Sequence, residues 1–217
     1  MRKRQFCTVF LLAALAALGV AVAAAQPDIP HPVSRTDVAV SLYGAFNEKT
    51  TGNEIAQSPS NAAGGMIELR HIANPIFGFE ATYSFNRANQ VYNSLAGNTS
   101  CPSSPCASVP ATVSANAHEV TGDWVPSIRI ANLRPFAVLG VGLLLNVPSS
   151  GQTNTSTSTK PVYVYGAGLD WGLLPHIGLR FQYRGNLYQA PDVTRLYTSS
   201  GAFTHTAGPM IGAYFRF

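Results

Sequence analysis

The chain has 217 residues, of which 46% are hydrophobic and only 11% are charged, with a formal net charge of +4. A soluble domain usually has about 25% charged residues, so a water-facing surface would be hard to build from this composition. After the N-terminal segment there is neither a basic run, which argues against nucleic-acid binding, nor the roughly 18 consecutive apolar residues of a membrane-spanning helix.

The first 25 residues have the pattern of a secretory signal peptide. Arg2, Lys3 and Arg4 precede an apolar run over 6–22, and three alanines end at Ala25. Small residues before the cut are typical of cleavage, so we expect cleavage after Ala25, and the alternative is an uncleaved membrane anchor. Residues 26–35 contain three prolines and are expected to form a periplasmic lead-in without regular structure.

The rest of the chain alternates between apolar and polar side chains, which predicts strands. In the segment 76–86 one face carries Phe77, Phe79, Ala81, Tyr83 and Phe85. The segment 177–187 repeats the pattern, with apolar residues on one face and Arg180, Gln182 and Arg184 on the other. Similar patterns predict eight strands, at 36–46, 62–72, 76–86, 118–131, 135–145, 161–173, 176–187 and 203–217.

The connections between these strands alternate in length. Short ones are predicted at 73–75, 132–134 and 174–175, and long polar ones at 47–61, 87–117, 146–160 and 188–202. The long loops have too few apolar side chains to bury a core of their own, so we expect them to be mobile. Short turns on one rim and long loops on the other are typical of bacterial transmembrane barrels. A soluble barrel would reverse the two faces of each strand, and the arginines and glycines on the polar face favour a narrow interior.

The last residues carry a resemblance to a known family. The chain ends in "AYFRF", in which Tyr214, Phe215 and Phe217 look like the C-terminal signal that outer-membrane proteins present to the barrel assembly machinery. Together with the strand layout, the chain resembles the small OmpA/OmpX-type barrels, without a peptidoglycan-binding domain. The expected fold is an all-β, eight-stranded antiparallel up-and-down transmembrane β-barrel over 36–217.

The resemblance also implies where the protein is and what surrounds it. We expect it in the cell outer membrane, as a monomer, in contact with outer-membrane lipids and lipopolysaccharide and with the assembly machinery. Its long loops would then be extracellular and its short turns periplasmic.

The polar face of the predicted strands places charged side chains inside the barrel. The expected lumen network consists of Glu68, Arg70, Glu80, Asp123, Arg129, Asp170, Arg180 and Arg184, with Asp37, Glu119 and Arg216 in or near the lumen. Buried charges must pair, and an eight-stranded barrel has an interior that side chains can fill. The prediction is a plugged lumen, and the alternative is a small pore gated by rearranged pairs.

Catalysis is the other alternative, because some barrels of this type modify lipid A. Deacylases among them carry His and Ser two residues apart on a strand. The mature chain has five histidines, and the residues two positions after them are valine, alanine or glycine. We therefore expect no catalytic residue, no cofactor and no metal, and a structural or surface-interaction role.

Two cysteines, Cys101 and Cys106, lie within the long loop 87–117. Export would place them in an oxidising compartment, which predicts a disulfide between them. A metal site is the alternative, but two thiols without nearby partners do not complete a tetrahedral shell.

Overall fold

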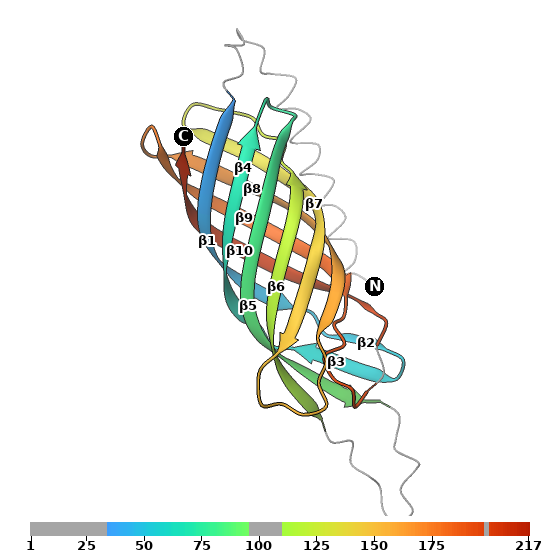
Figure 1. Ribbon diagram of the computed structural model, residues 1–217. Helices are drawn as coiled ribbons and strands as arrows, with labels where there is room; N and C mark the ends of the chain where they lie inside the picture. The colour runs from blue at the N-terminus through green and yellow to red at the C-terminus, as the bar shows by residue number, and fades with distance from the viewer. Residues whose placement is uncertain (1–33, 96–109, 198–199) are drawn as a thin grey trace, which may run out of the picture. The chain divides into compact units, whose positions relative to one another are not determined.

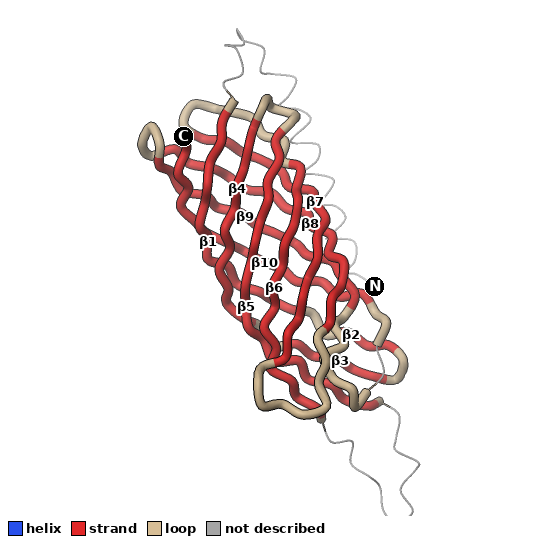
Figure 2. Tube along the Cα trace, viewed as in Figure 1, coloured by secondary structure: helices blue, strands red, loops and turns tan. Residues whose placement is uncertain are grey.

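The computed structural model describes residues 34–95, 110–197 and 200–217 of the protein. Eight strands close a barrel: β1 (Arg35–Asn47), β4 (Ala62–Ile72), β5 (Gly78–Ser94), β6 (Ala111–Trp124), β7 (Leu133–Pro148), β8 (Ser158–Gly172), β9 (Ile177–Gln189) and β10 (Phe203–Arg216). Neighbouring strands are antiparallel, β10 pairs with β1, and β6 pairs with both β5 and β7 (Figures 1 and 2). The predicted eight-stranded antiparallel barrel is confirmed. Among the described residues, there is no helix that is long and apolar enough to span a membrane.

The side chains of each strand point alternately outward and inward, as a strand requires. On β5, Phe79 is 58% exposed, whereas its neighbour Glu80 is 3% exposed. On β9, Phe181 is 38% exposed and Arg180 is 1% exposed. The apolar face is therefore the outer one, which is the orientation of a membrane barrel and the reverse of a soluble one.

The two rims of the barrel differ in the length of their connections. Residues 73–77, 125–132 and 173–176 form the turns of one rim, where β1 begins and β10 ends (Figure 1). The longer connections follow β1, β5, β7 and β9, and these strands reach the opposite rim at Asn47, Ser94, Pro148 and Gln189. We call the first the short-turn rim and the second the long-loop rim.

One predicted strand boundary and its turn are wrong at the short-turn rim. The segment 118–131 was expected to be a strand followed by a turn at 132–134, but β6 ends at Trp124. Pro126 has no N–H to donate to a ladder, so regular pairing cannot continue through it. Residues 125–132 instead form a wider turn, closed by isolated bridges between Ser127 and Phe136 and between Ile130 and Leu133.

The long-loop rim is more ordered than the sequence predicted. The expected loop 47–61 contains two further strands, β2 (Thr50–Gly52) and β3 (Ile55–Pro59). Much of the expected loop 87–117 is strand, because β5 continues to Ser94 and pairs with β6 up to Tyr92 opposite Ala111. β3 pairs with this C-terminal end of β5, so the barrel wall extends into a small sheet at this rim, at the lower end of the view in Figure 2.

Candidate functional site

Arg180 on β9 is the centre of an ionic cluster in the lumen near the short-turn rim. Its Nη1 donates to Glu68 Oε2 at 2.7 Å, and its Nη2 donates to Asp37 Oδ1 at 2.8 Å. Its Nε donates to Asp170 Oδ1 at 2.7 Å, and Nη1 lies 3.5 Å from Glu80 Oε2. The four carboxylates come from β1, β4, β5 and β8, so one guanidinium connects β9 to four other strands of the barrel.

Arg70 on β4 extends this cluster. Its Nε donates to Glu80 Oε2 at 2.6 Å, and its Nη1 lies 3.5 Å from Asp170 Oδ2. The register places Arg70 directly opposite Glu80 on the neighbouring strand, so the pair forms between adjacent strands on the inner face. The guanidinium carbon of Arg70 also lies 4.0 Å from the centre of the Phe136 ring, a cation–π contact.

Arg35 closes the cluster toward the short-turn rim, although its segment was expected to be lead-in. It is the first residue of β1 and is buried. Its Nε donates to Asp37 Oδ2 at 2.9 Å, and its Nη2 donates to Asp170 Oδ2 at 3.3 Å. The guanidinium carbon lies 4.6 Å from the centre of the Tyr214 ring, so this terminal-strand tyrosine faces the lumen.

A second cluster surrounds Arg184, which lies two inward positions beyond Arg180 on β9, with Gln182 between them. Its Nη1 donates to Asp123 Oδ2 at 2.8 Å, and its Nη2 donates to Thr121 Oγ1 at 2.6 Å. Glu119 lies 3.9 Å from Arg184 Nη2 and accepts a hydrogen bond of 2.6 Å from Asn186 Nδ2. The two clusters thus occupy different levels of the lumen, and the buried Gln182 lies between them on β9.

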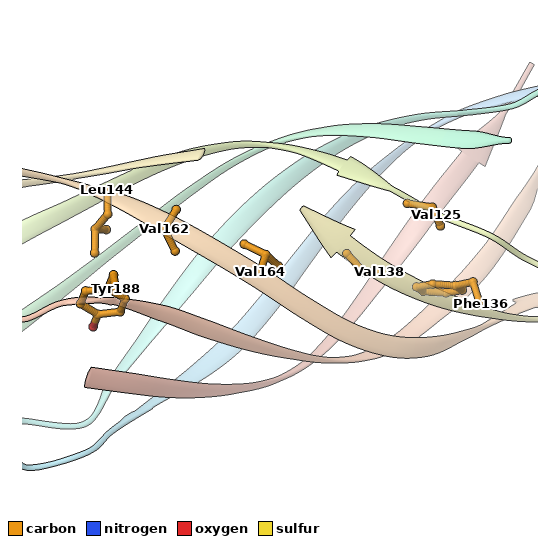
Figure 3. Close-up of a cluster of buried hydrophobic side chains, with 7 residues drawn as sticks. All are labelled: Val125, Phe136, Val138, Leu144, Val162, Val164 and Tyr188. Carbon is orange, nitrogen blue, oxygen red and sulfur yellow. The ribbon is translucent and has the colours of Figure 1, made fainter. Parts of the chain in front are cut away.

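Apolar side chains fill the space beside these charges. Seven buried residues from β7, β8, β9 and the turn after β6 form one set, Val125, Phe136, Val138, Leu144, Val162, Val164 and Tyr188. Figure 3 shows them spread along the barrel, with Phe136 and Val125 toward one end and Leu144 and Tyr188 toward the other. Between Tyr188 and the Arg184 cluster is a cavity of about 40 Å³, also lined by Tyr43, Ser84 and Asn186. This volume is far below the roughly 300 Å³ of a typical small-molecule pocket.

The long-loop rim is covered by residues of the β9–β10 connection. Gln57 on β3 donates from Nε2 to Gln90 Oε1 at 3.0 Å and to the Pro191 carbonyl at 3.1 Å. The Tyr92 hydroxyl also donates to the Pro191 carbonyl, at 2.5 Å. Val193 is fully buried in an apolar cluster with Tyr92 and neighbouring residues. The connection is thereby held inside the mouth.

The structure brings together all but one of the eight residues of the expected lumen network. Arg129 is exposed at the short-turn rim, where its Nε donates to the Ala131 carbonyl at 3.3 Å, so its assignment to the network is wrong. The reason is the early end of β6, which removes Arg129 from the strand alternation. Arg35 takes a place in the cluster that sequence reasoning missed, and its spacing of two from Asp37 was the signal that both share a face.

The remaining expected residues lie elsewhere. Phe215 and Phe217 are 51% and 66% exposed on the outer side of the barrel at the short-turn rim. Cys101 and Cys106 lie outside the described residues, as does the expected signal peptide. In the part of the chain that the structure describes, no group of three or more His, Cys, Asp and Glu residues could hold a metal ion.

His205 is the histidine with the most suggestive surroundings for acid–base chemistry. Its Nδ1 lies 3.9 Å from Glu48 Oε1, and its Nε2 is 2.9 Å from the Tyr165 hydroxyl. The glutamate side chain is 69% exposed. A nucleophile is needed beside such a pair, and the hydrogen bonds found for His205 among the described residues include no serine or cysteine.

The comparisons with known proteins identify the family. The sequence matches the model of the outer membrane protein beta-barrel domain over residues 10–207, which is most of the chain. The protein therefore belongs to this family of outer-membrane β-barrels, and the resemblance noted in the sequence is confirmed. No curated protein matches the sequence.

Solved structures of small outer-membrane barrels are similar in fold. The outer membrane protein OprG from Pseudomonas aeruginosa aligns with a TM-score of 0.55 at 10% identity, covering 88% of this chain and 99% of that one. Neisserial surface protein A (NspA) aligns with a TM-score of 0.54 at 11% identity, covering 84% of this chain and 97% of that one. Identities this low show the shared fold alone.

Proposed function

We propose that this protein is a non-enzymatic, monomeric outer-membrane barrel whose lumen is plugged by side chains. Its role would be structural or would consist of surface contacts made by the long-loop rim. In this proposal, the first 25 residues are a cleaved signal peptide, and the lead-in expected over 26–35 is periplasmic, except that its last residue, Arg35, begins β1.

The Arg180 cluster is the observation that carries the proposal. Arg180 is 1% exposed, and its hydrogen bonds connect Asp37, Glu68 and Asp170 across the lumen. Opening a path through this level would separate buried charges, and breaking one such pair costs roughly 3–5 kcal/mol. The Arg184 cluster and the Pro191 connection add further levels of packing along the same axis.

The unequal rims support an orientation in the membrane. Bacterial barrels have short periplasmic turns and longer extracellular loops, so the short-turn rim would face the periplasm. Phe215 and Phe217 would then lie in the aromatic girdle at the periplasmic interface and, with Tyr214, form the signal read by the assembly machinery.

The sheet at the long-loop rim supports a role in surface contacts. β5 has 17 residues, whereas a transmembrane strand needs only about 9–11. The excess extends beyond the membrane and carries β3, which in turn pairs with β2. A disulfide between Cys101 and Cys106 would close the connection that follows this extension.

Two measurements test the proposal together. The refolded protein should migrate differently on an SDS gel before and after heating, as a closed barrel does, and should remain silent in planar bilayers under voltage. A variant lacking both partners of one pair, Arg70→Ala with Glu80→Ala, leaves no unpaired charge and should also show no conductance, because Arg180, the Arg184 cluster and the Pro191 connection still close the lumen. Discrete openings in the unaltered protein would contradict the plug and favour a gated pore.

The enzymatic alternative has its own measurement. Mass spectrometry of lipid A from cells with and without the protein should give identical spectra. A shift by the mass of one acyl chain that depends on the protein would overturn the non-enzymatic assignment.

A further inference from the structure

The short-turn rim contains a second cavity, which the lumen network does not fill. It has a volume of about 260 Å³ and lies between the turn 125–132, the turn 173–176 and the end of β10. Four arginines line it, Arg35, Arg129, Arg134 and Arg216, and Asp170 is the one acidic residue in its lining.

Three of these arginines have only neutral hydrogen-bond acceptors among the described residues. Arg129 Nε donates to the Ala131 carbonyl, and Arg216 Nη2 donates to the Pro175 carbonyl. Arg134 Nη1 donates to Ser127 Oγ at 3.3 Å. Arg134 Nε is buried and has no hydrogen-bond partner in the part of the chain described. A buried guanidinium donor normally has an acceptor, so the Arg134 guanidinium keeps a donor that no described acceptor satisfies.

Asp170 does not neutralise this group. Its Oδ1 accepts from Arg180 at 2.7 Å, and its Oδ2 accepts from Arg35 at 3.3 Å and lies 3.5 Å from Arg70. Within the lining of the cavity, four guanidiniums therefore face one carboxylate that is already paired, which leaves the cavity with a positive charge.

Apolar side chains also line the cavity beside the arginines. Leu173 and Leu174 belong to its lining and are 48% and 63% exposed. Exposed leucines next to a group of guanidiniums suit a ligand that is anionic at one end and apolar at the other. A periplasmic rim meets such a molecule in the inner leaflet of its own membrane.

We propose that this cavity binds the phosphodiester headgroup of an anionic phospholipid from the periplasmic leaflet. Arg134 and Arg129 donate to the phosphate oxygens, since guanidinium groups match phosphate geometry in bidentate fashion. Leu173 and Leu174 contact the glycerol and the first acyl carbons. Basic pockets at a membrane surface are suited to such headgroups. The proposal rests on the periplasmic orientation of the short-turn rim given above.

The test uses the full mature chain refolded in a non-ionic detergent. Isothermal titration would compare dihexanoyl phosphatidylglycerol, dihexanoyl phosphatidylcholine and inorganic phosphate. Phosphatidylglycerol should bind more tightly than either of the others. Arg134→Gln and Arg129→Gln should each weaken its binding about tenfold, the effect of losing a hydrogen bond between charged groups. Arg195→Gln, an exposed arginine at the long-loop rim, should leave binding unchanged.

Each outcome bears on the proposal. Equal binding of phosphatidylglycerol by the Arg129 variant would overturn it, and because Arg129 is exposed this variant avoids a folding defect. Binding of inorganic phosphate as tight as that of the lipid would overturn the assignment to a headgroup. Heat-dependent gel migration is measured on the same samples. Loss of this behaviour in the unaltered protein would count against the proposed function, which needs a closed barrel, whereas normal migration without lipid binding rejects only this site.

Discussion

Replacing Arg180 by methionine should destabilise the barrel more than any change to a single exposed charge. The substitution keeps much of the side-chain volume but removes the donors to Asp37, Glu68 and Asp170. Asp37 and Asp170 keep hydrogen bonds from Arg35. Among the described residues, Glu68 then keeps one hydrogen bond, from the Ser41 hydroxyl at 2.5 Å.

Glu68 therefore sets the size of the effect. A buried charge that loses its partner costs roughly 3–5 kcal/mol, and we expect a loss of that size in the free energy of unfolding. Replacing Glu68 by glutamine in the Arg180→Met background removes the uncompensated charge. The double variant should recover about 1–3 kcal/mol of the loss.

Urea unfolding of the protein in lipid vesicles, followed by tryptophan fluorescence, measures these differences. The matched control is Arg195→Met, because Arg195 is exposed at the long-loop rim and should change stability by less than about 0.5 kcal/mol. A loss below about 1 kcal/mol for Arg180→Met, or no recovery in the double variant, would refute the view that Arg180 neutralises Glu68.

Three further predictions concern the wall of the barrel. Val141→Arg places a charge on the outer face near the middle of β7 and should cost about 2–4 kcal/mol in vesicle unfolding, whereas an unchanged midpoint would argue against lipid contact there. Gly140→Ala should lower the free energy of unfolding by about 1–3 kcal/mol, because the new Cβ would lie 1.8 Å from Asp123 Oδ1. Gly122→Ala is the control and should be neutral, because no atom lies within 4 Å of its Cβ. Equal effects of the two substitutions would contradict this contact. Deleting Phe217 should lower the fraction of heat-modifiable protein in cell membranes without preventing refolding in detergent. Normal assembly of this variant in cells would exclude recognition of Phe217 by the barrel assembly machinery.

The alternation of side chains predicted the strands and the direction of each face, and the alternating lengths of the connections, with the C-terminal resemblance, predicted the barrel. Phe79 and Glu80 illustrate why. Adjacent residues on a strand point to opposite sides of the wall, and the side in contact with lipid carries apolar side chains whereas the lumen side carries polar ones. The extension of β5 escaped prediction because its inward residues there include Ala88 and Gln90, and its outward ones include Asn89. Above the membrane neither face needs to be apolar, so the pattern that reveals a spanning strand disappears.

The lumen partners could not be predicted because they depend on register and barrel closure. Arg180 and Glu68 are 112 residues apart, and no local pattern relates them. Arg129 was misplaced because alternation was continued past Pro126, where the ladder ends. Arg35 was overlooked because it follows a proline-rich segment, although Asp37 shares its face.

The seam between β1 and β10 has a consequence for insertion into the membrane. These two strands pair from Asp37 opposite Arg216 to Asn47 opposite Thr206. Arg180, on β9, can reach Asp37 and Glu68 only once this seam has formed, because β10 lies between β9 and β1. In a partly inserted sheet, unpaired strand edges and unpaired charges would both be exposed to the bilayer. We therefore expect pairing of β1 with β10 and formation of the ion pairs to occur together, in one cooperative step.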